Sequence, residues 1–331
     1  MKQVLNRLIA HESLGREEAR EILTEISAGR YDSHQVASFM TIFMMRNITV
    51  EELTGFQEAL QSLCISIDVS SFDPIDLCGT GGDQKDTFNI STLASFVTAG
   101  AGVPVAKHGN YGVSSSCGSS NVMEYLGIHF TADPEVLKRC LDQANICVFH
   151  APLFHPAMKA VAPIRKALGV KTFFNMLGPL VNPGFVKKQL VGVFSLELAR
   201  LYAYRFQHSD MRYGIVHALD GYDEVSLTGA AKLINASGER LIDASSFGFN
   251  RLTPDQIAGG NDIKASAQLF MNILEGKGTV AQNHVVLANA ALAIATAEDL
   301  PLEKALERAT ESLLEKKALA AFQTLKKVAA L

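Results

Sequence analysis

Three stretches of the chain carry residue types and spacings that are suited to chemistry. The first, IDLCGTGGDQKDTFNIST, combines a short apolar run, a glycine turn and Asn89–Thr92, which opens a predicted helix. Glycines let the backbone approach a ligand closely, and free N–H groups at a helix start favour an anion. The residue order matches neither the Walker A loop nor G-x-G-x-x-G. We therefore predict an anion cradle, with a tight turn capped by Ser91 or Thr92 as the simpler interpretation.

The second stretch, VPVAKHGNYGVSSSCGSSNVMEYLG, has the same plan. A predicted strand ends at Lys107-His108, a Gly/Ser loop follows, and Asn121 with Glu124 is predicted to start a helix with capping-box spacing. Lys107 supplies a point charge, and the loop serines supply hydroxyl and backbone donors. His108 is interpreted as a structural hydrogen-bonding residue. Because two such units follow one another, we predict that both loops bind one ligand with two anionic ends. The alternative is that they are two ordinary connecting loops.

The third stretch, ALDGYDEVSLTG, follows the apolar run YGIVHAL and carries Asp220, Asp223 and Glu224. Mg²⁺ binds one or two carboxylates and leaves its other positions to water and substrate phosphate. The pair Asp223-Glu224 is therefore predicted to hold Mg²⁺, with a solvated acidic turn as the alternative.

Arg165 lies in the mostly apolar segment FHPAMKAVAPIRKALG, where an unpaired guanidinium is costly. It is expected either to form a forked pair with a substrate carboxylate or to meet an internal Asp or Glu. The sequence contains no G-x-S-x-G elbow and no local nucleophile–base pair. The sequence thus offers two anion-binding loops and a pair of carboxylates for Mg²⁺, but no nucleophile. This combination predicts a reaction in which the enzyme stabilises a phosphorylated leaving group.

The amino-terminal residues, 1–68, have helical patterns only. The segment REEAREILTEISAG repeats apolar residues on one face, and the run from Val36 to Phe43 has the same spacing. Thr49 and Glu52 occupy capping-box positions, which indicates a further helix start. These patterns predict a small all-helical domain.

From Pro74, the short apolar runs IDLC, VPVAKH, QLVGVF and YGIVHAL alternate with helical stretches. This alternation is typical of an α/β domain with a mainly parallel sheet flanked by helices. The tail from Pro254 is predicted to be helical, with Thr253 as the cap. We predict a helical domain at 1–70, rejoined by a returning segment near 165–185, and a larger α/β domain at 71–331.

Composition narrows the class of protein. The 331 residues are 48% hydrophobic and carry a net charge of −4, which argues against a protein held to nucleic acid by phosphate contacts. Five cysteines without a C-x-x-C pair indicate reduced thiols rather than a disulfide or zinc scaffold. Neither a signal peptide nor an apolar run of roughly 20 residues is found, so we expect a cytoplasmic protein without a membrane span.

These stretches together resemble the anthranilate phosphoribosyltransferase family, with DLCGTGGD, TFNIST, VAKHGN, GSSNVMEYLG, FNMLGPLVNP, DGYDEVSLTG and ANAALA in family order. The resemblance implies a homodimer with a small helical domain, a larger domain that binds phosphoribosyl pyrophosphate (PRPP), and an active site in the cleft between them. Such enzymes join anthranilate to PRPP and release pyrophosphate with Mg²⁺, two ions per site, in tryptophan biosynthesis. No residue is assigned as a catalytic acid or base, because an aromatic amine is already neutral at pH 7.

By position, the resemblance also implies the residues of each subsite. The implied PRPP site consists of Gly79, Gly82, Asp83, Thr87, Asn89, Ile90, Ser91, Thr92, Lys107, His108, Gly109, Asn110, Tyr111, Gly112, Val113, Ser114, Ser115 and Ser119. The implied metal ligands are Ser91, Asp223 and Glu224. The implied contacts of anthranilate are Gly79, Asn110 and Arg165.

The sequence departs from the family pattern mainly in the second loop. Tyr111 stands where Arg is common, Ser116-Cys117 replaces a more usual Lys-Ser, and Asn121 replaces Asp, while Asn283 takes a late position that is often Asp. Two alternatives remain: a pyrimidine nucleoside phosphorylase of similar architecture, and an inactive relative that binds nucleic acid. The stretches GTGGD, NIST and DGYDEVS favour PRPP over inorganic phosphate, and the negative net charge disfavours nucleic acid.

Overall fold

The computed structural model describes residues 1–112 and 117–330, and the chain forms two compact units. The helical unit consists of Met1–Ser66 and Ala151–Pro183, and the α/β unit consists of Ile67–His150 and Gly184–Leu331. The chain thus enters the α/β unit, returns to the helical unit once, and goes back. The returning segment begins at Ala151, ahead of the position near 165 at which the sequence pattern placed it.

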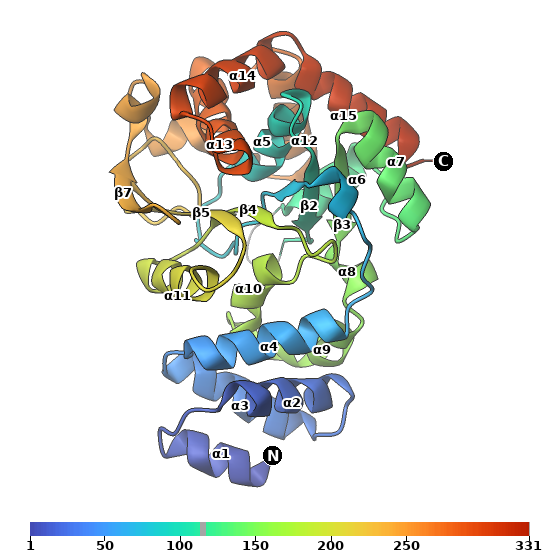
Figure 1. Cartoon of the computed structure of the whole chain (residues 1–331), viewed down its shortest axis with the longest axis vertical. Helices are drawn as coiled ribbons and strands as arrows, with labels where there is room; N and C mark the ends of the chain where they lie inside the picture. Colours follow the sequence, from blue (N-terminus) through green and yellow to red (C-terminus); the bar gives the residue numbers. More distant parts are fainter. Residues whose placement is uncertain (113–116, 331) are drawn as a thin grey trace. The chain divides into compact units, whose positions relative to one another are not determined.

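The helical unit follows the local signals of the sequence (Figure 1). The side chain of Asp32 caps α3, and Thr49 with Glu52 forms the predicted capping box at the start of α4. Its first four helices are α1 (Lys2–Ile9), α2 (Arg16–Ser27), α3 (Ser33–Met45) and α4 (Val50–Ser62). The returning segment adds α8 (Ala151–Phe154), α9 (Ala157–Leu168), α10 (Phe174–Leu177) and the 3₁₀ turn η2 (Gly178–Leu180).

An aromatic cluster ties the returning segment into this bundle. Phe173 stacks on Phe56 of α4 at 4.7 Å between ring centroids, and both lie against Phe39 and Phe43 of α3. Edge-to-face and offset ring pairs add about 0.5–1.5 kcal/mol each beyond the apolar area that they bury. The returning segment is therefore part of the core of the helical unit and not a surface loop.

Gly55 permits the close approach of α4 to α2, so we expect Gly55→Ala to destabilise the protein. A Cβ atom at this position would lie 2.2 Å from the Arg16 carbonyl oxygen and 2.8 Å from the Ala19 Cβ. Overpacking of this kind costs about 1–3 kcal/mol, which outweighs the roughly 1 kcal/mol that Ala gains over Gly inside a helix. Thermal unfolding measures the effect. The matched control is Gly178→Ala, where a Cβ meets nothing within 4 Å, and an equal loss in both variants would contradict the argument.

The α/β unit is built on a seven-stranded sheet of order β3-β2-β1-β4-β5-β6-β7. The first five strands in this order pair in parallel, and β5, β6 and β7 pair antiparallel. Its strands are β1 (Ile75–Asp76), β2 (Val105–Gly109), β3 (Ile146–His150), β4 (Lys188–Gly192), β5 (Arg212–Ala218), β6 (Ala231–Asn235) and β7 (Gly238–Ile242). The predicted fold class, a helical domain plus an α/β domain with a mainly parallel sheet, is confirmed.

Helices cover this sheet, with α13 and α5 on one side and α11 on the other in Figure 1. The α-helices of this unit are α5 (Ile90–Gly100), α6 (Ser119–Tyr125), α7 (Pro134–Ala144), α11 (Leu196–Phe206), α12 (Ile263–Leu274), α13 (Val280–Glu298), α14 (Leu302–Leu314) and α15 (Lys317–Val328). Short 3₁₀ turns are η1 (Ser70–Phe72), η3 (Ala244–Phe247) and η4 (Pro254–Ile257). Of the described helices, α13 alone is long and apolar enough to cross a membrane, and 67% of its most apolar window is buried inside the protein.

Three local predictions need correction. The four apolar runs from IDLC to YGIVHAL are strands as predicted, but β3 and the β6–β7 hairpin were missed. Thr253-Pro254 opens only the 3₁₀ turn η4, and the following helix starts later, capped by Asp262. Helix α6 starts at Ser119 with Gly118 as its cap, so Asn121 is a first-turn residue and not the start. Thr253 thus caps a shorter element than predicted, and Asn121 occupies the third helical position, where the sequence pattern predicted the helix start.

Candidate active site

Three loops meet beyond the carboxyl ends of parallel strands in the α/β unit. They are the first loop (77–89, after β1), the second loop (110–118, after β2, described at 110–112 and 117–118) and the acidic loop (219–230, after β5). Such crevices are where open parallel sheets bind ligands. The three chemistry-bearing stretches of the sequence are therefore brought to one edge of one sheet.

Backbone hydrogen bonds attach the first loop directly to the acidic pair. The Gly81 amide donates to Asp223 Oδ2 at 2.8 Å, and the Ser91 amide at the start of α5 donates to Glu224 Oε1 at 2.9 Å. Gly81 and Gly82 adopt φ values of 61° and 78°, which glycine reaches without a Cβ clash. A Cβ at Gly79 would lie 3.0 Å from Asp223 Oδ2. The position of the first loop is thus fixed by hydrogen bonds to the two carboxylates.

The acidic pair lies in a desolvated environment, which disfavours the charged form of both carboxyl groups. Burial, followed by the neighbouring Asp83, raises the pKa of Asp223 from 3.8 to about 7. Burial and the nearby Asp223 raise the pKa of Glu224 well above its ordinary value. Among the described residues, no Lys, Arg or His forms an ion pair with either carboxylate. The solvated acidic turn considered from the sequence is therefore wrong, because Asp223 is only 9% exposed.

The donor set fits Mg²⁺. A hard cation would supply the charge that Asp223 and Glu224 lack, and the Ser91 hydroxyl lies beside the Glu224 carboxylate. The described residues contain no group of three His, Cys, Asp or Glu side chains arranged as a ready metal cage. Two carboxylates and one hydroxyl leave several coordination positions for water and phosphate oxygens, which is how Mg²⁺ is usually held.

Asn289 holds the acidic loop from the opposite side, and sequence reasoning assigned it no role. Its Oδ1 accepts from the Val225 amide at 3.1 Å, and its Nδ2 donates to the Val225 carbonyl at 2.9 Å. Asn289 is 5% exposed within the apolar helix α13. A lone Asn inside ANAALA was a usable signal, because a buried amide needs hydrogen-bond partners.

Asn121 joins the two described ends of the second loop, and Asn110 bonds its own neighbour at the start of that loop. Asn121 Oδ1 accepts from both the Gly112 and Gly118 amides at 3.0 Å, and Asn110 Oδ1 accepts from the Tyr111 amide at 2.8 Å. Asn89 Nδ2 donates to the Cys117 carbonyl at 3.2 Å, which joins the second loop to the first. Three of the predicted PRPP residues lie outside the described residues: Val113, Ser114 and Ser115.

Among the polar residues of the predicted PRPP site, Lys107 has a hydrogen-bond partner within the protein, whereas the Thr92 hydroxyl has none among the described atoms. Lys107 is 2% exposed and donates from Nζ to the Leu77 carbonyl at 2.8 Å, so its charge lies beneath the first loop. The His108 amide donates to Asp76 Oδ1 at 3.1 Å. Thr92 in the first turn of α5 is fully buried, and its Oγ1 has no partner among the described atoms. A buried hydroxyl without a partner is costly, and a ligand at this helix start would supply one.

The remaining predicted PRPP residues lie around the same loops. Asp83 Oδ1 accepts a hydrogen bond from the Lys85 amide at 3.0 Å, and Asp83 Oδ2 lies 3.5 Å from the Asp223 amide nitrogen. Thr87 forms an isolated antiparallel β-bridge with Ala258. Asn89 caps α5, Ile90 opens it, Gly109 ends β2, and Ser119 Oγ donates to the Asn110 carbonyl at 3.3 Å. Gly82 is half-buried in the first loop, and Gly112 is exposed in the second.

Arg165 lies in α9 of the helical unit, whereas Gly79 and Asn110 belong to the α/β unit. Its Nη2 reaches Asn175 Oδ1 at 3.4 Å, and its guanidinium lies 5.4 Å from the Phe174 ring centroid. Burial lowers the pKa of Arg165, and among the described residues it has no carboxylate partner. The alternative of an internal Asp or Glu is therefore wrong, and the guanidinium keeps its capacity to bind an anion.

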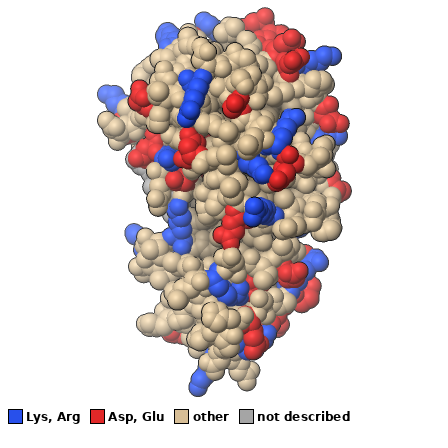
Figure 2. All heavy atoms as spheres, turned by 90° about the vertical axis from the view of Figure 1, so that its left-hand side faces the viewer, with Lys and Arg blue, Asp and Glu red and all other residues tan. Residues whose placement is uncertain are grey.

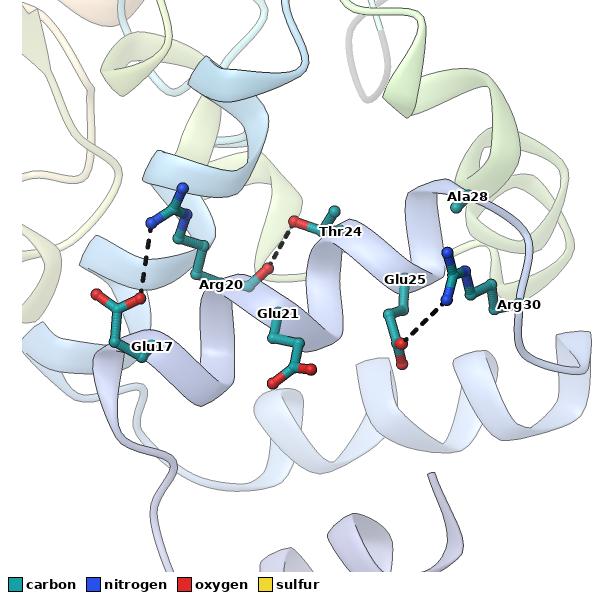
Figure 3. Close-up of a pocket in the computed structure, with 7 residues that line it drawn as sticks. All are labelled: Glu17, Arg20, Glu21, Thr24, Glu25, Ala28 and Arg30. Carbon is teal, nitrogen blue, oxygen red and sulfur yellow. Dashed lines mark hydrogen bonds and ion pairs between the residues drawn. The ribbon is translucent and has the colours of Figure 1, made fainter.

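A separate hollow lies on the helical unit, along α2 (Figure 3). Its volume is about 450 Å³, and its lining consists of Glu17, Arg20, Glu21, Thr24, Glu25, Ala28 and Arg30. Arg20 pairs with Glu17, and Arg30 pairs with Glu25. Glu21, which has no ion-pair partner among the described residues, therefore leaves the lining with a negative charge that does not suit PRPP. Figure 2 shows basic and acidic side chains interspersed on the face it presents, without a continuous basic stripe.

Comparison with known proteins places the chain in a family. Residues 72–319 match the model described as the glycosyl transferase family, a/b domain, and residues 2–64 match its helical bundle domain. The anthranilate phosphoribosyltransferase of Flavobacterium psychrophilum is 62% identical over 328 residues, which cover 99% of this chain and 98% of that protein. The two models define the class, a glycosyl transferase made of a helical bundle and an α/β domain.

Solved structures agree with this class. Anthranilate phosphoribosyltransferase from Thermus thermophilus superimposes with a TM-score of 0.92 at 30% identity and covers 99% of both chains. The Saccharomyces cerevisiae enzyme in complex with PRPP and Mg superimposes with a TM-score of 0.91 at 26% identity, covering 98% of this chain and 96% of that one. The chain belongs to the anthranilate phosphoribosyltransferase family.

Proposed function

We propose that the protein transfers the phosphoribosyl group of PRPP to the amine of anthranilate in tryptophan biosynthesis. The products are N-(5-phosphoribosyl)anthranilate and pyrophosphate. The observation that carries this proposal is the joining of the glycine loop to the acidic pair, through the Gly81 and Ser91 amides. Family membership supports it independently.

The PRPP site is proposed to be the edge where the first and second loops meet the acidic loop. Amides of the first loop and of the start of α5 would bind phosphate oxygens, and the unpartnered Thr92 hydroxyl would add one donor. Mg²⁺, two ions per site, would be held by Ser91, Asp223 and Glu224 and would neutralise charge on the departing pyrophosphate. The protein is left with positioning the ribose C1 and excluding water, because the attacking amine is neutral at pH 7.

Anthranilate is proposed to contact Gly79, Asn110 and Arg165. A carboxylate is the natural partner of a half-buried guanidinium that, among the described residues, has no acidic partner. The aromatic ring of the substrate would then be oriented by its carboxylate, with the amine directed toward the reacting carbon.

A fluorescence assay tests this function. The purified protein is incubated with PRPP, Mg²⁺ and anthranilate, and loss of anthranilate fluorescence is followed. Turnover that depends on all three components supports the proposal, and well-folded protein without turnover contradicts it. Phosphorolysis of a pyrimidine nucleoside is the comparison assay, and activity there in place of anthranilate turnover would favour a nucleoside phosphorylase.

The protein is proposed to act in the cytoplasm as a homodimer formed through the helical unit. Ile9, Met44 and Met45 at the ends of α1 and α3 are 67%, 41% and 83% exposed, and a second copy would cover them. We expect sedimentation velocity at low micromolar concentration to give a dimer. Met45→Glu, which places a charge on this patch, is expected to shift the species toward monomer. A parent protein that sediments as a monomer would contradict the proposal.

A further inference from the structure

The structure assigns His150 a positioning role toward the second loop, through Ser120 and Tyr111, and this assignment rests on the proposed function of that loop in binding PRPP. His150 is the last residue of β3, and in the sheet it is paired with Gly109, the last residue of β2. It is 4% exposed. The imidazole therefore lies beside the point at which the second loop leaves the sheet.

One hydrogen bond connects His150 to the start of α6. His150 Nδ1 and Ser120 Oγ are 3.0 Å apart, and Ser120 is fully buried. The Ser120 amide donates to the Asn110 carbonyl at 3.2 Å, and Ser119 Oγ reaches the same carbonyl at 3.3 Å. A movement of Ser120 would therefore move Asn110 and Ser119, which are both proposed to bind substrate.

Two aromatic rings enclose the imidazole. Phe130 stacks on it at 4.4 Å between ring centroids with an interplanar angle of 15°, and Tyr111 meets it edge-on at 4.7 Å and 78°. The Tyr111 hydroxyl donates to Glu124 Oε1 at 3.2 Å, on the same helix as Ser120. Tyr111, which stands where relatives commonly have Arg, is thus packed against His150 instead of offering a cation to the ligand.

Burial lowers the pKa of His150, although the nearby Glu124 acts in the opposite direction. The imidazole is therefore neutral near pH 7, with one ring nitrogen able to accept a hydrogen bond and the other able to donate one. A neutral ring held by one hydroxyl and two aromatic faces fixes an orientation, and it adds no charge to the anion site.

A double-mutant cycle on Ser120 and His150 tests the assignment. Ser120→Ala removes the hydroxyl alone, and His150→Phe keeps a ring between Phe130 and Tyr111 but removes Nδ1. We expect each variant to weaken PRPP binding, measured by calorimetry with Mg²⁺, by about fivefold, the equivalent of about 1 kcal/mol. The KM for anthranilate is expected to rise as well, because Asn110 is also proposed to contact anthranilate. The double variant is expected to be no weaker than either single variant, because both remove the same bond.

The matched control is Ser312→Ala, which removes a fully buried serine hydroxyl bonded to the Val97 carbonyl at 2.7 Å. It is expected to lower the melting temperature and leave PRPP affinity unchanged. If Ser120→Ala and His150→Phe leave PRPP affinity at the parent value, or if their effects add in full, His150 is only a core residue. If His150→Phe does not fold, Ser120→Ala carries the test. A parent protein that fails to bind PRPP would overturn the proposed function itself.

Discussion

Replacing Asp223 by Asn and Glu224 by Gln is expected to lower turnover by at least about a thousandfold while leaving the folded structure intact. A divalent ion contributes several kcal/mol to stabilising a phosphorylated leaving group, and each 1.36 kcal/mol is a factor of ten in rate. The amide oxygens of Asn and Gln can still accept from the Gly81 and Ser91 amides, so both loop attachments survive. Initial rates at saturating PRPP and anthranilate measure the effect.

The same double variant is expected to melt at or above the temperature of the metal-free parent at pH 7. The folded-state pKa of Asp223 is raised from 3.8 to about 7, so between these values the folded protein holds more protons than the unfolded chain. Stability of the metal-free parent therefore falls as pH rises from about 4 to about 7, and neutral amides remove this loss. Thermal unfolding in the presence of a chelator, at pH 5 and at pH 7, measures this effect. The melting temperature of the parent is expected to fall more between these pH values than that of the double variant.

Asp220→Asn is the matched control, because it removes a carboxylate from the same loop at an exposed position. We expect its turnover to stay within about threefold of the parent rate. Equal losses in the Asp220 variant and in the double variant would mean that the loop responds to any change of charge. Near-normal Mg²⁺-dependent turnover in the double variant would remove the metal assignment.

The parts of the fold that could be predicted are those specified by neighbouring residues. The capping box of Thr49 and Glu52 and the apolar face of α2 are local patterns, and both appear as predicted. Strand β3 was missed although ICVFH is fully buried, as long as the predicted strand β2 and richer in apolar residues. The β6–β7 hairpin was missed because β7, GERLI, is half polar and mostly exposed, although Ser237-Gly238 is a turn signal.

The site was predictable where a loop follows a parallel strand, since such loops converge at one edge of the sheet. Partners that reach the loops from distant elements were not predictable. Asn289 bonds Val225 across 64 residues, and Ser120 bonds His150 across 30, and no spacing rule connects either pair. The uncompensated burial of Asp223 and the missing carboxylate partner of Arg165 depend on the whole unit around them, so only the structure decides between the alternatives that the sequence left open.

Arg165→Ala is expected to raise the KM for anthranilate by about ten- to a hundredfold and to leave the KM for PRPP nearly unchanged. A bidentate guanidinium–carboxylate bond is worth about 1.5–3 kcal/mol when partly desolvated, and 1.4 kcal/mol is a factor of ten. Arg165→Lys is expected to restore only part of the affinity, because an ammonium keeps the charge but not the fork. Steady-state kinetics with each substrate varied in turn measure both constants.

Stability supplies the second readout for Arg165. Its side-chain hydrogen bond with Asn175 is long, and no carboxylate of the described residues pairs with it, so Arg165→Ala strands no buried charge. The melting temperature is therefore expected to change little. Lys166→Ala, which removes the exposed neighbouring cation on α9, is the matched control and is expected to leave both KM values unchanged. A variant that melts well below the parent, or that loses affinity for both substrates together, would show that Arg165 supports the helical unit and does not recognise anthranilate.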